Sequence, residues 1–126
     1  MYQRQLTFRE ALVKVLSNNY CNFSGRASRS EFWWFTLFTS ILGCICNLFD
    51  FYSTTLGYAL ASGVSLALLL PCLGLSWRRM HDIGKRGGWI FINLIPAIGW
   101  IIFLILCAQA SQPGPNRFGE EPNMVY

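Results

Sequence analysis

The sequence predicts an all-α integral membrane protein in which three transmembrane helices follow a short amphipathic N-terminal helix. Composition is the first observation: of 126 residues, 53% are apolar and 13% are charged, and the mean hydropathy is +0.36. A soluble domain of this length would distribute charges along its helices, whereas here the charges gather in patches between long uncharged segments. The length of those segments is the second observation, and together they predict a single membrane domain over residues 1–126.

The first predicted element is an interfacial helix over residues 7–18. Thr7 and Glu10 match a capping box, in which the hydroxyl and the carboxylate satisfy the first free amides of a helix. Apolar residues then recur at three- and four-residue spacing and form one stripe: Phe8, Leu12, Val15 and Leu16. Such a stripe suits a helix that lies in the membrane interface, or one that packs on the ends of the transmembrane helices.

Two long apolar segments predict the first two transmembrane helices, over residues 29–49 and 56–77. Each has about 20 residues, which is enough to cross a hydrocarbon core of about 30 Å. Trp33 and Trp34 lie at the start of the first helix, where amphipathic rings are favoured at the depth of the lipid headgroups.

A third uncharged segment, residues 88–110, predicts a third transmembrane helix with Pro96 near its middle. Proline removes one backbone hydrogen bond, so we expect a single helix that is kinked at this point. The alternative is a re-entrant hairpin that breaks at residues 95–99 and returns the chain to the side of the N-terminus. Residues 111–126 are rich in proline and glycine and predict an extended tail.

The basic residues are distributed unequally between the two sides of the predicted helices. They lie before the first helix or in a loop over residues 78–87, apart from Arg117 in the tail: Arg4, Arg9, Lys14, Arg26, Arg29, Arg78, Arg79, Lys85 and Arg86. The positive-inside rule therefore places the N-terminus and the basic loop in the cytoplasm. Three transmembrane helices would place the tail on the opposite side.

The basic loop and the start of the first transmembrane helix hold the candidate functional residues. Positive charge beside a membrane predicts binding to anionic lipid headgroups or to a partner protein, through Arg26, Arg29, Arg78, Arg79, Lys85 and Arg86. Opposite charges at the same depth predict a structural ion-pair cluster: Glu31, Arg78, Arg79, His81 and Asp82. Asp82 follows Arg78 by four residues and Arg79 by three, so on one helix it could pair with both.

The sequence contains no complete catalytic or metal-binding set. His81 beside Asp82 resembles a general base with an orienting carboxylate, but adjacent side chains on a helix point apart and no nucleophile lies nearby in the sequence. The five cysteines lack the spacing of a disulfide framework or a zinc site. We expect no catalytic residue, no cofactor and no metal, and we assign the net charge of +4 to membrane topology rather than to nucleic-acid binding.

Several short motifs follow one another in a fixed order over residues 20–122. They are Gly25-Arg26-Ala27-Ser28-Arg29-Ser30-Glu31-Phe32-Trp33, Leu70-Pro71, Arg78-Arg79-Met80-His81-Asp82-Ile83-Gly84, Gly88-Trp89, Ile95-Pro96-Ala97-Ile98-Gly99 and Pro113-Gly114-Pro115-Asn116-Arg117-Phe118-Gly119. This ordered set resembles the small bacterial inner-membrane proteins catalogued as domain of unknown function eight hundred and five. The chain departs from that pattern at Gly87, where serine is usual, and at residues 120–122, where Pro-Asp-Pro is usual. The resemblance implies a multi-span inner-membrane protein and marks Asn116, Arg117 and Gly119 as a tail motif.

We expect a noncatalytic membrane module whose cytoplasmic basic cluster binds anionic phospholipids or a partner, either a membrane protein or a second copy of the chain. Two alternatives remain open, namely a small oligomeric transporter or channel subunit and a membrane enzyme that acts on lipid headgroups. No ionisable residue marks a pathway midway along a predicted transmembrane helix, which disfavours transport.

Overall fold

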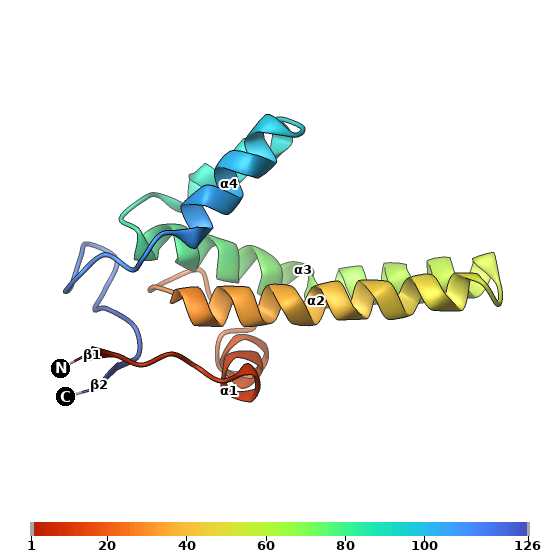
Figure 1. Cartoon of the computed structure of the whole chain (residues 1–126), viewed down its shortest axis with the longest axis horizontal. Helices are drawn as coiled ribbons and strands as arrows, with labels where there is room; N and C mark the ends of the chain where they lie inside the picture. Colours follow the sequence, from red (N-terminus) through yellow and green to blue (C-terminus); the bar gives the residue numbers. More distant parts are fainter. Residues whose placement is uncertain (1, 126) are drawn as a thin grey trace.

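The computed structural model describes residues 2–125, which form two long antiparallel helices, a helical hairpin beside them and a small N-terminal helix (Figure 1). The elements in chain order are β1 (Tyr2–Gln3), α1 (Phe8–Val13), the π-helical turn η1 (Lys14–Asn18), α2 (Arg29–Asp50), α3 (Thr54–Asp82), the 3₁₀ helix η2 (Gly87–Leu94), α4 (Ile98–Ala108) and β2 (Met124–Val125). The predicted helical fold class is confirmed. The two strands are a single two-residue pair that joins the ends of the chain.

The two long helices form the axis of the molecule and have the length of membrane-spanning helices. α2 has 22 residues and α3 has 29, which correspond to about 33 Å and about 43 Å at 1.5 Å per residue. Ser28 and Ser53 cap them by accepting hydrogen bonds from the amides of Glu31 and Leu56. In the most apolar window of each helix, 17% of the residues are buried. A core helix of a soluble protein would be mostly buried, so this exposure favours contact with lipid.

α3 is longer than predicted and takes in part of the expected basic loop. We predicted a helix over residues 56–77 and a loop over residues 78–87, but the helix begins at Thr54 and continues to Asp82. The charged side chains of its last turn find partners in neighbouring segments, so charge does not end the helix there. The chain turns away at Gly84, whose φ of 80° lies in the left-handed region that favours glycine.

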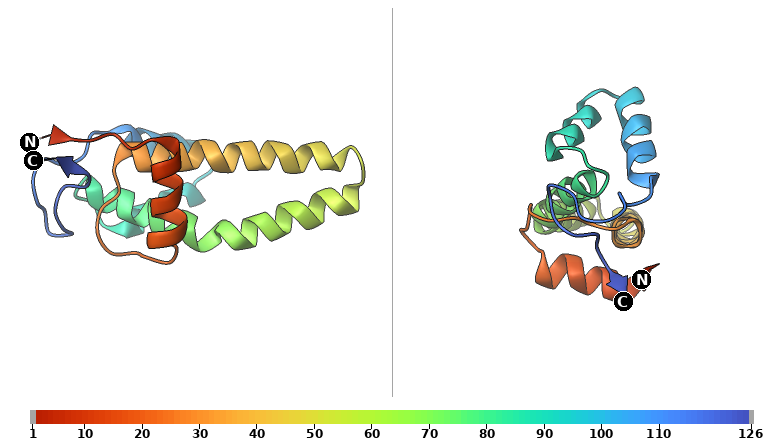
Figure 2. Two further views of the ribbon diagram at one scale, coloured as in Figure 1. Left: turned by 90° about the horizontal axis from the view of Figure 1, so that it is seen from below. Right: turned by 90° about the vertical axis from the view of Figure 1, so that its left-hand side faces the viewer.

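The segment predicted as a third transmembrane helix over residues 88–110 is a helical hairpin, which was the alternative, and not one kinked helix. η2 and α4 run beside each other and are joined by a tight turn (Figures 1 and 2). Ala97 has φ 63° and ψ −65°, and the amide of Ile98 donates to the carbonyl of Pro96 at 2.7 Å, which is a γ-turn. Gly99 permits the close approach of the two arms, because a Cβ atom there would clash with the carbonyl oxygen of Ile92.

The hairpin returns the chain to the end of the molecule where α2 begins (Figure 1). The tail is held there by the N-terminal segment, since the Gln3 side chain donates to the Ser111 hydroxyl at 2.8 Å and to the Pro122 carbonyl at 3.1 Å. The amide of Arg4 donates to the carbonyl of Asn123 at 2.8 Å. The expectation that the tail lies opposite the N-terminus is therefore wrong.

The predicted N-terminal helix is formed by α1 and η1, which lie across the first part of α2 (Figure 2). The predicted capping box is present, and the Phe8 ring packs edge-on against Trp34 and Phe38. Buried apolar side chains from η1, the loop before α2, α2, α3 and α4 meet in one cluster: Val15, Ala27, Phe32, Phe35, Leu75, Met80, Leu106 and Cys107. The core therefore lies at the end where the loops gather, and the outer parts of α2 and α3 extend beyond it (Figure 1).

Candidate functional site

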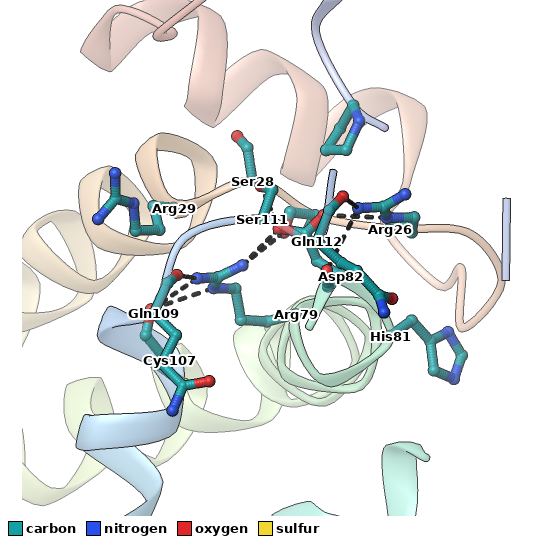
Figure 3. Close-up of polar contacts among 12 residues, drawn as sticks. Arg26, Ser28, Arg29, Arg79, His81, Asp82, Cys107, Gln109, Ser111 and Gln112 are labelled. Atoms are coloured by element: carbon teal, nitrogen blue, oxygen red, sulfur yellow. Dashed lines mark hydrogen bonds and ion pairs between the residues drawn. The ribbon is translucent and has the colours of Figure 1, made fainter. Parts of the chain in front are cut away.

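The buried charged residues gather at one end of the molecule, which we call the polar cap. It consists of residues 19–28, the first turn of α2, the last turns of α3, and the tail from residue 109 to residue 123. Figure 3 shows the side chains of Arg79, from α3, and Arg26, from the loop before α2, on different sides of Asp82 and the start of the tail. The loop of residues 19–28 passes closely over α3 at Gly74. A Cβ atom added at Gly74 would lie 2.8 Å from the carbonyl oxygen of Asn22.

Asp82 is the centre of the polar cap. Its Oδ1 accepts a hydrogen bond from Arg26 Nε at 3.0 Å, and its Oδ2 accepts from Arg79 Nη1 and from the Ser111 hydroxyl, both at 2.5 Å. The side chain of Asp82 is 0% exposed. Burial raises the pKa of Asp82, while the Ser111 hydroxyl and the two guanidinium groups act in the opposite direction. One carboxylate thus joins three segments that are far apart in the sequence.

The two guanidinium groups also satisfy backbone carbonyls of the last segment. Arg26 donates to the carbonyls of Gln112 at 2.5 Å and Gly114 at 2.7 Å. Arg79 donates through Nη2 at 2.9 Å and through Nε at 3.1 Å to the carbonyl of Cys107, in the last turn of α4. The final carbonyls of a helix lack partners within the helix. Arg79 therefore stabilises the end of α4 in addition to pairing with Asp82.

A second ion pair joins the start of α2 to the end of α3. Arg78 Nη1 donates to Glu31 Oε1 at 2.7 Å, and the ammonium of Lys14 lies 3.3 Å from Glu31 Oε2. Arg78 Nε donates to the carbonyl of Asn22 at 3.2 Å. The prediction that Asp82 pairs with both arginines of the motif is therefore wrong for Arg78, because successive residues on a helix point in different directions.

His81 was predicted to belong to the ion-pair cluster, but its ring lies outside both networks. Its Nδ1 is 3.0 Å from the carbonyl oxygen of Gly25, and the ring stacks on Phe118 with centroids 3.9 Å apart. Burial lowers the pKa of His81, and nearby Arg117 lowers it further, against the effect of the Gly25 carbonyl. Within residues 2–125 no carboxylate hydrogen-bonds to this ring, and no group of three or more His, Cys, Asp or Glu side chains could hold a metal ion.

The tail motif forms a tight loop that holds Phe118 against His81. The Asn116 side-chain amide donates to the His81 carbonyl at 3.0 Å, and its carbonyl oxygen accepts from the amide of Phe118 at 2.9 Å. Asn116 and Gly119 exchange backbone hydrogen bonds at 2.9 Å and 3.1 Å. The guanidinium of Arg117 lies 4.7 Å from the centroid of the Phe118 ring and is exposed. Asn116 and Gly119 are thus structural residues of the polar cap.

The six basic residues predicted to bind lipid or a partner fall into two groups. Three are buried and engaged within the polar cap: Arg26, Arg78 and Arg79. Arg29 and Arg86 are exposed and Lys85 is half-buried, and in the described part of the chain these three make no ion pair. The Lys85 ammonium lies 4.7 Å from the centroid of the Trp89 ring. We call Arg29, Lys85 and Arg86 the basic rim.

Sequence reasoning did not find two partners of the buried carboxylates, Lys14 and Ser111. Ser111 lies 29 residues from Asp82, and its hydrogen bond depends on the return of the chain through the hairpin. Neither residue has a local signal, because spacing on a helix reveals partners only three or four residues apart.

Comparison with known proteins agrees with the resemblance noted in the sequence. Residues 20–120 match the family described as "Protein of unknown function (DUF805)". Inner membrane protein YhaI of Escherichia coli (strain K12) is 40% identical over 105 residues, which cover 82% of this chain and 88% of YhaI. Inner membrane protein YhaH of the same strain is 37% identical over 119 residues, which cover 89% and 95%. No solved structure matches the chain. The matched residues include α2, α3, the hairpin and most of the polar cap, and the chain belongs to this DUF805 family of bacterial inner-membrane proteins.

Proposed function

We propose that the protein is a noncatalytic membrane module that binds anionic phospholipid headgroups through the basic rim. The observation that carries this proposal is the division of the basic residues into two groups. The buried arginines donate their hydrogen bonds to groups inside the polar cap, whereas the rim presents positive charge beside exposed tryptophans. Basic and amphipathic aromatic side chains at one level are the combination that favours a lipid headgroup region.

In this proposal α2 and α3 cross the bilayer as an antiparallel pair. The length of α2, about 33 Å, suits a hydrocarbon core of about 30 Å. Trp33 and Trp34 lie at the cap end, and Phe51 and Tyr52, which are 90% and 91% exposed, lie at the turn between the helices. Aromatic residues would therefore occupy both membrane interfaces.

The hairpin of η2 and α4 would enter the same bilayer from the cap side and return. η2 has 8 residues and α4 has 11, so neither can cross it alone. Polar groups within the hairpin satisfy one another: Trp100 Nε1 donates to the Asn93 carbonyl at 2.9 Å, and Asn93 Nδ2 donates to the Ile90 carbonyl at 2.9 Å. This internal pairing is what irregular backbone at membrane depth requires.

The proposed orientation places the polar cap in the cytoplasm. The turn at residues 51–53 contains no lysine or arginine, and the basic residues of α2 and α3 lie at their cap ends. Because the hairpin returns the tail to the cap, Arg117 lies on the same side as the other basic residues. The positive-inside rule then favours one orientation for the whole chain.

The energy available from the rim is modest. Each lysine or arginine near an anionic membrane surface contributes about 1 kcal/mol, so the rim contributes about 3 kcal/mol. That is enough to select anionic lipids about a hundred-fold, and the apolar helices hold the protein in the bilayer.

The test measures which lipids remain bound after reconstitution into nanodiscs of mixed phosphatidylcholine and phosphatidylglycerol and release into mild detergent. Native mass spectrometry compares the natural chain with a Lys85→Gln, Arg86→Gln variant. The control is an Arg9→Gln, Arg117→Gln variant, which removes the same charge from exposed positions outside the rim. We expect the rim variant to lose about ten-fold or more of the retained phosphatidylglycerol, and the control to keep it.

Equal retention in the two variants would contradict headgroup binding by the rim. A co-purifying protein that is lost from the rim variant alone, with unchanged lipid, would also overturn the proposal and would make the rim a protein-binding surface.

A further inference from the structure

A cleft beside the start of α2 has one charged end and one apolar end. Its volume is about 570 Å³, and it opens to the outside between the N-terminal segment, α2 and the last residue of α4. The residues that matter to the argument are Leu6, Arg29, Trp33, Trp34, Leu37 and Ala108. Cavities of this size hold small organic ligands.

Arg29 supplies the charged end of the cleft. In the described part of the chain it makes no ion pair, and its one hydrogen bond is a long one, from Nη1 to the Ala108 carbonyl at 3.4 Å. A guanidinium has five N–H donors in a planar fork, so most of the donors of Arg29 are available to an anion. Gln5, which also lines the cleft, has an exposed side chain.

The apolar end follows α2 away from the polar cap. Arg29, Trp33 and Leu37 are spaced four residues apart, so they lie on one face of the helix. Each step of four residues advances about 6 Å along the axis, which places Leu37 about 12 Å beyond Arg29. Trp33 and Leu37 are 37% and 45% exposed, so this face is only partly covered within the described chain.

The wall of the cleft is fixed by contacts within the protein. The Trp34 indole N–H donates to the carbonyl of Leu6 at 2.8 Å, and the Phe8 ring packs edge-on against Trp34. The amide of Leu6 donates to the buried hydroxyl of Ser30 at 3.0 Å. The N-terminal segment is thereby held against α2, and the cleft exists before any ligand enters.

We propose that this cleft binds one anionic glycerophospholipid, with its phosphate on Arg29 and an acyl chain along Trp33 and Leu37. The occupant follows from the order of charge and apolar surface along α2, which matches the order of phosphate and acyl chain in a membrane lipid. A phosphate accepts two parallel hydrogen bonds from a guanidinium, whereas the ammonium of a zwitterionic headgroup would be repelled by it. This inference rests on the membrane placement given under the proposed function, and it adds a discrete, saturable site to the headgroup binding of the rim.

The test is a native mass spectrometry titration of the full chain with phosphatidylglycerol, in detergent that contains phosphatidylcholine. We expect a one-to-one adduct that saturates before further lipids add. Arg29→Gln should weaken that adduct by about ten-fold or more, since hydrogen bonds to charged groups contribute strongly. Arg117→Gln, which removes an equal charge from an exposed position outside the cleft, should leave it unchanged.

A second variant tests the shape of the cleft independently of its charge. Ala108 is exposed and lines the cleft, so Ala108→Phe fills it without altering any ionisable group. We expect the one-to-one adduct to be lost in this variant, and bromine atoms on the acyl chains of phosphatidylglycerol to quench its tryptophan fluorescence less than in the natural chain. The melting temperature of each variant shows whether the fold is retained.

The outcomes separate this inference from the proposed function. If Arg29→Gln and Ala108→Phe retain the adduct, the cleft is not a lipid site, whatever the Lys85→Gln, Arg86→Gln variant does. If the Lys85→Gln, Arg86→Gln variant retains its bulk selection of anionic lipid while the cleft variants lose the adduct, the cleft is confirmed and headgroup binding by Lys85 and Arg86 is not.

Discussion

The polar cap and the outer parts of α2 and α3 are stabilised in opposite ways. In the cap, the groups that are most difficult to remove from water, Asp82 and its guanidinium partners, are buried and fully engaged. In the outer parts, large apolar side chains such as Leu66 and Leu48 are 75% and 64% exposed. The cap depends on particular pairs, whereas a lipid-facing helix needs apolar character and little else. Substitutions should therefore be tolerated very differently in the two regions.

The largest effect should follow from removing the central carboxylate. Asp82→Asn leaves Arg26 and Arg79 buried without their counter-charge, which should lower the free energy of unfolding by about 3–5 kcal/mol. Asp50→Asn makes the same change at the exposed end of α2 and should cost less than about 0.5 kcal/mol. Denaturation in detergent, followed by tryptophan fluorescence, measures both. Similar losses would show that the cap is no more specific than the outer turn.

A glycine pair tests the role of close backbone packing. Gly99→Ala places a methyl group against the Ile92 carbonyl, and we expect the free energy of unfolding to fall by about 1–3 kcal/mol. Gly63→Ala, in the outer part of α3, meets no atom within 4 Å and should change stability by less than about 1 kcal/mol, in the stabilising direction. Thermal unfolding of the two variants measures these changes. A Gly99→Ala variant more stable than the natural chain would contradict the close approach of the two arms of the hairpin.

Two serines give a matched test of a hydrogen bond in each region. Ser111→Ala removes a buried donor to Asp82, and we expect a loss of about 1–2 kcal/mol because the acceptor is charged. Ser40→Ala removes an exposed hydroxyl that donates to the Thr36 carbonyl within α2, and should change stability by less than about 0.5 kcal/mol. When both are measured in the same detergent, the free energy of unfolding should fall more in Ser111→Ala than in Ser40→Ala. Equal values would contradict a central role for Asp82.

The smallest effect should be a pH dependence at His81. Its pKa is lowered in the folded protein, so below pH 6.5 the unfolded chain binds a proton more readily than the folded one. Stability is then full above pH 6.5 and falls as the pH decreases from there toward the lowered pKa. We expect the melting temperature to drop between pH 7.5 and pH 5.5 in the natural chain and to drop less in His81→Gln. An equal drop in both would assign the effect to another group.

The parts of the fold that were predicted from the sequence depend on local signals. The uncharged segment that begins after Glu31 located α2 to within one residue, and the three-residue spacing of Arg79 and Asp82 predicted their contact. The hairpin was predicted only as the alternative to a kinked helix, because Pro96 is compatible with either a kink or a break. The choice depends on the left-handed backbone of Ala97, for which alanine gives no signal.

The long-range hydrogen bonds and ion pairs of the polar cap also could not be predicted from the sequence. Arg26 and Asp82 are 56 residues apart, and they meet only because the loop before α2 crosses the end of α3. Arg26 was predicted to be a lipid-binding candidate. The local sequence around an arginine near a membrane helix is the same whether its side chain faces lipid or a buried carboxylate. Burial, which decides between the two, is a property of the assembled fold.

The position of Asp82 between early and late segments imposes an order on biosynthesis. Its partners lie at Arg26 and Arg79, which precede it, and at Ser111, which a ribosome adds only after the whole hairpin has been made. The long helices are therefore synthesised while the arginines of the cap still lack part of their final environment. The hydrogen bonds to Asp82 can therefore be completed only after the hairpin has been made and has returned the chain to the cap.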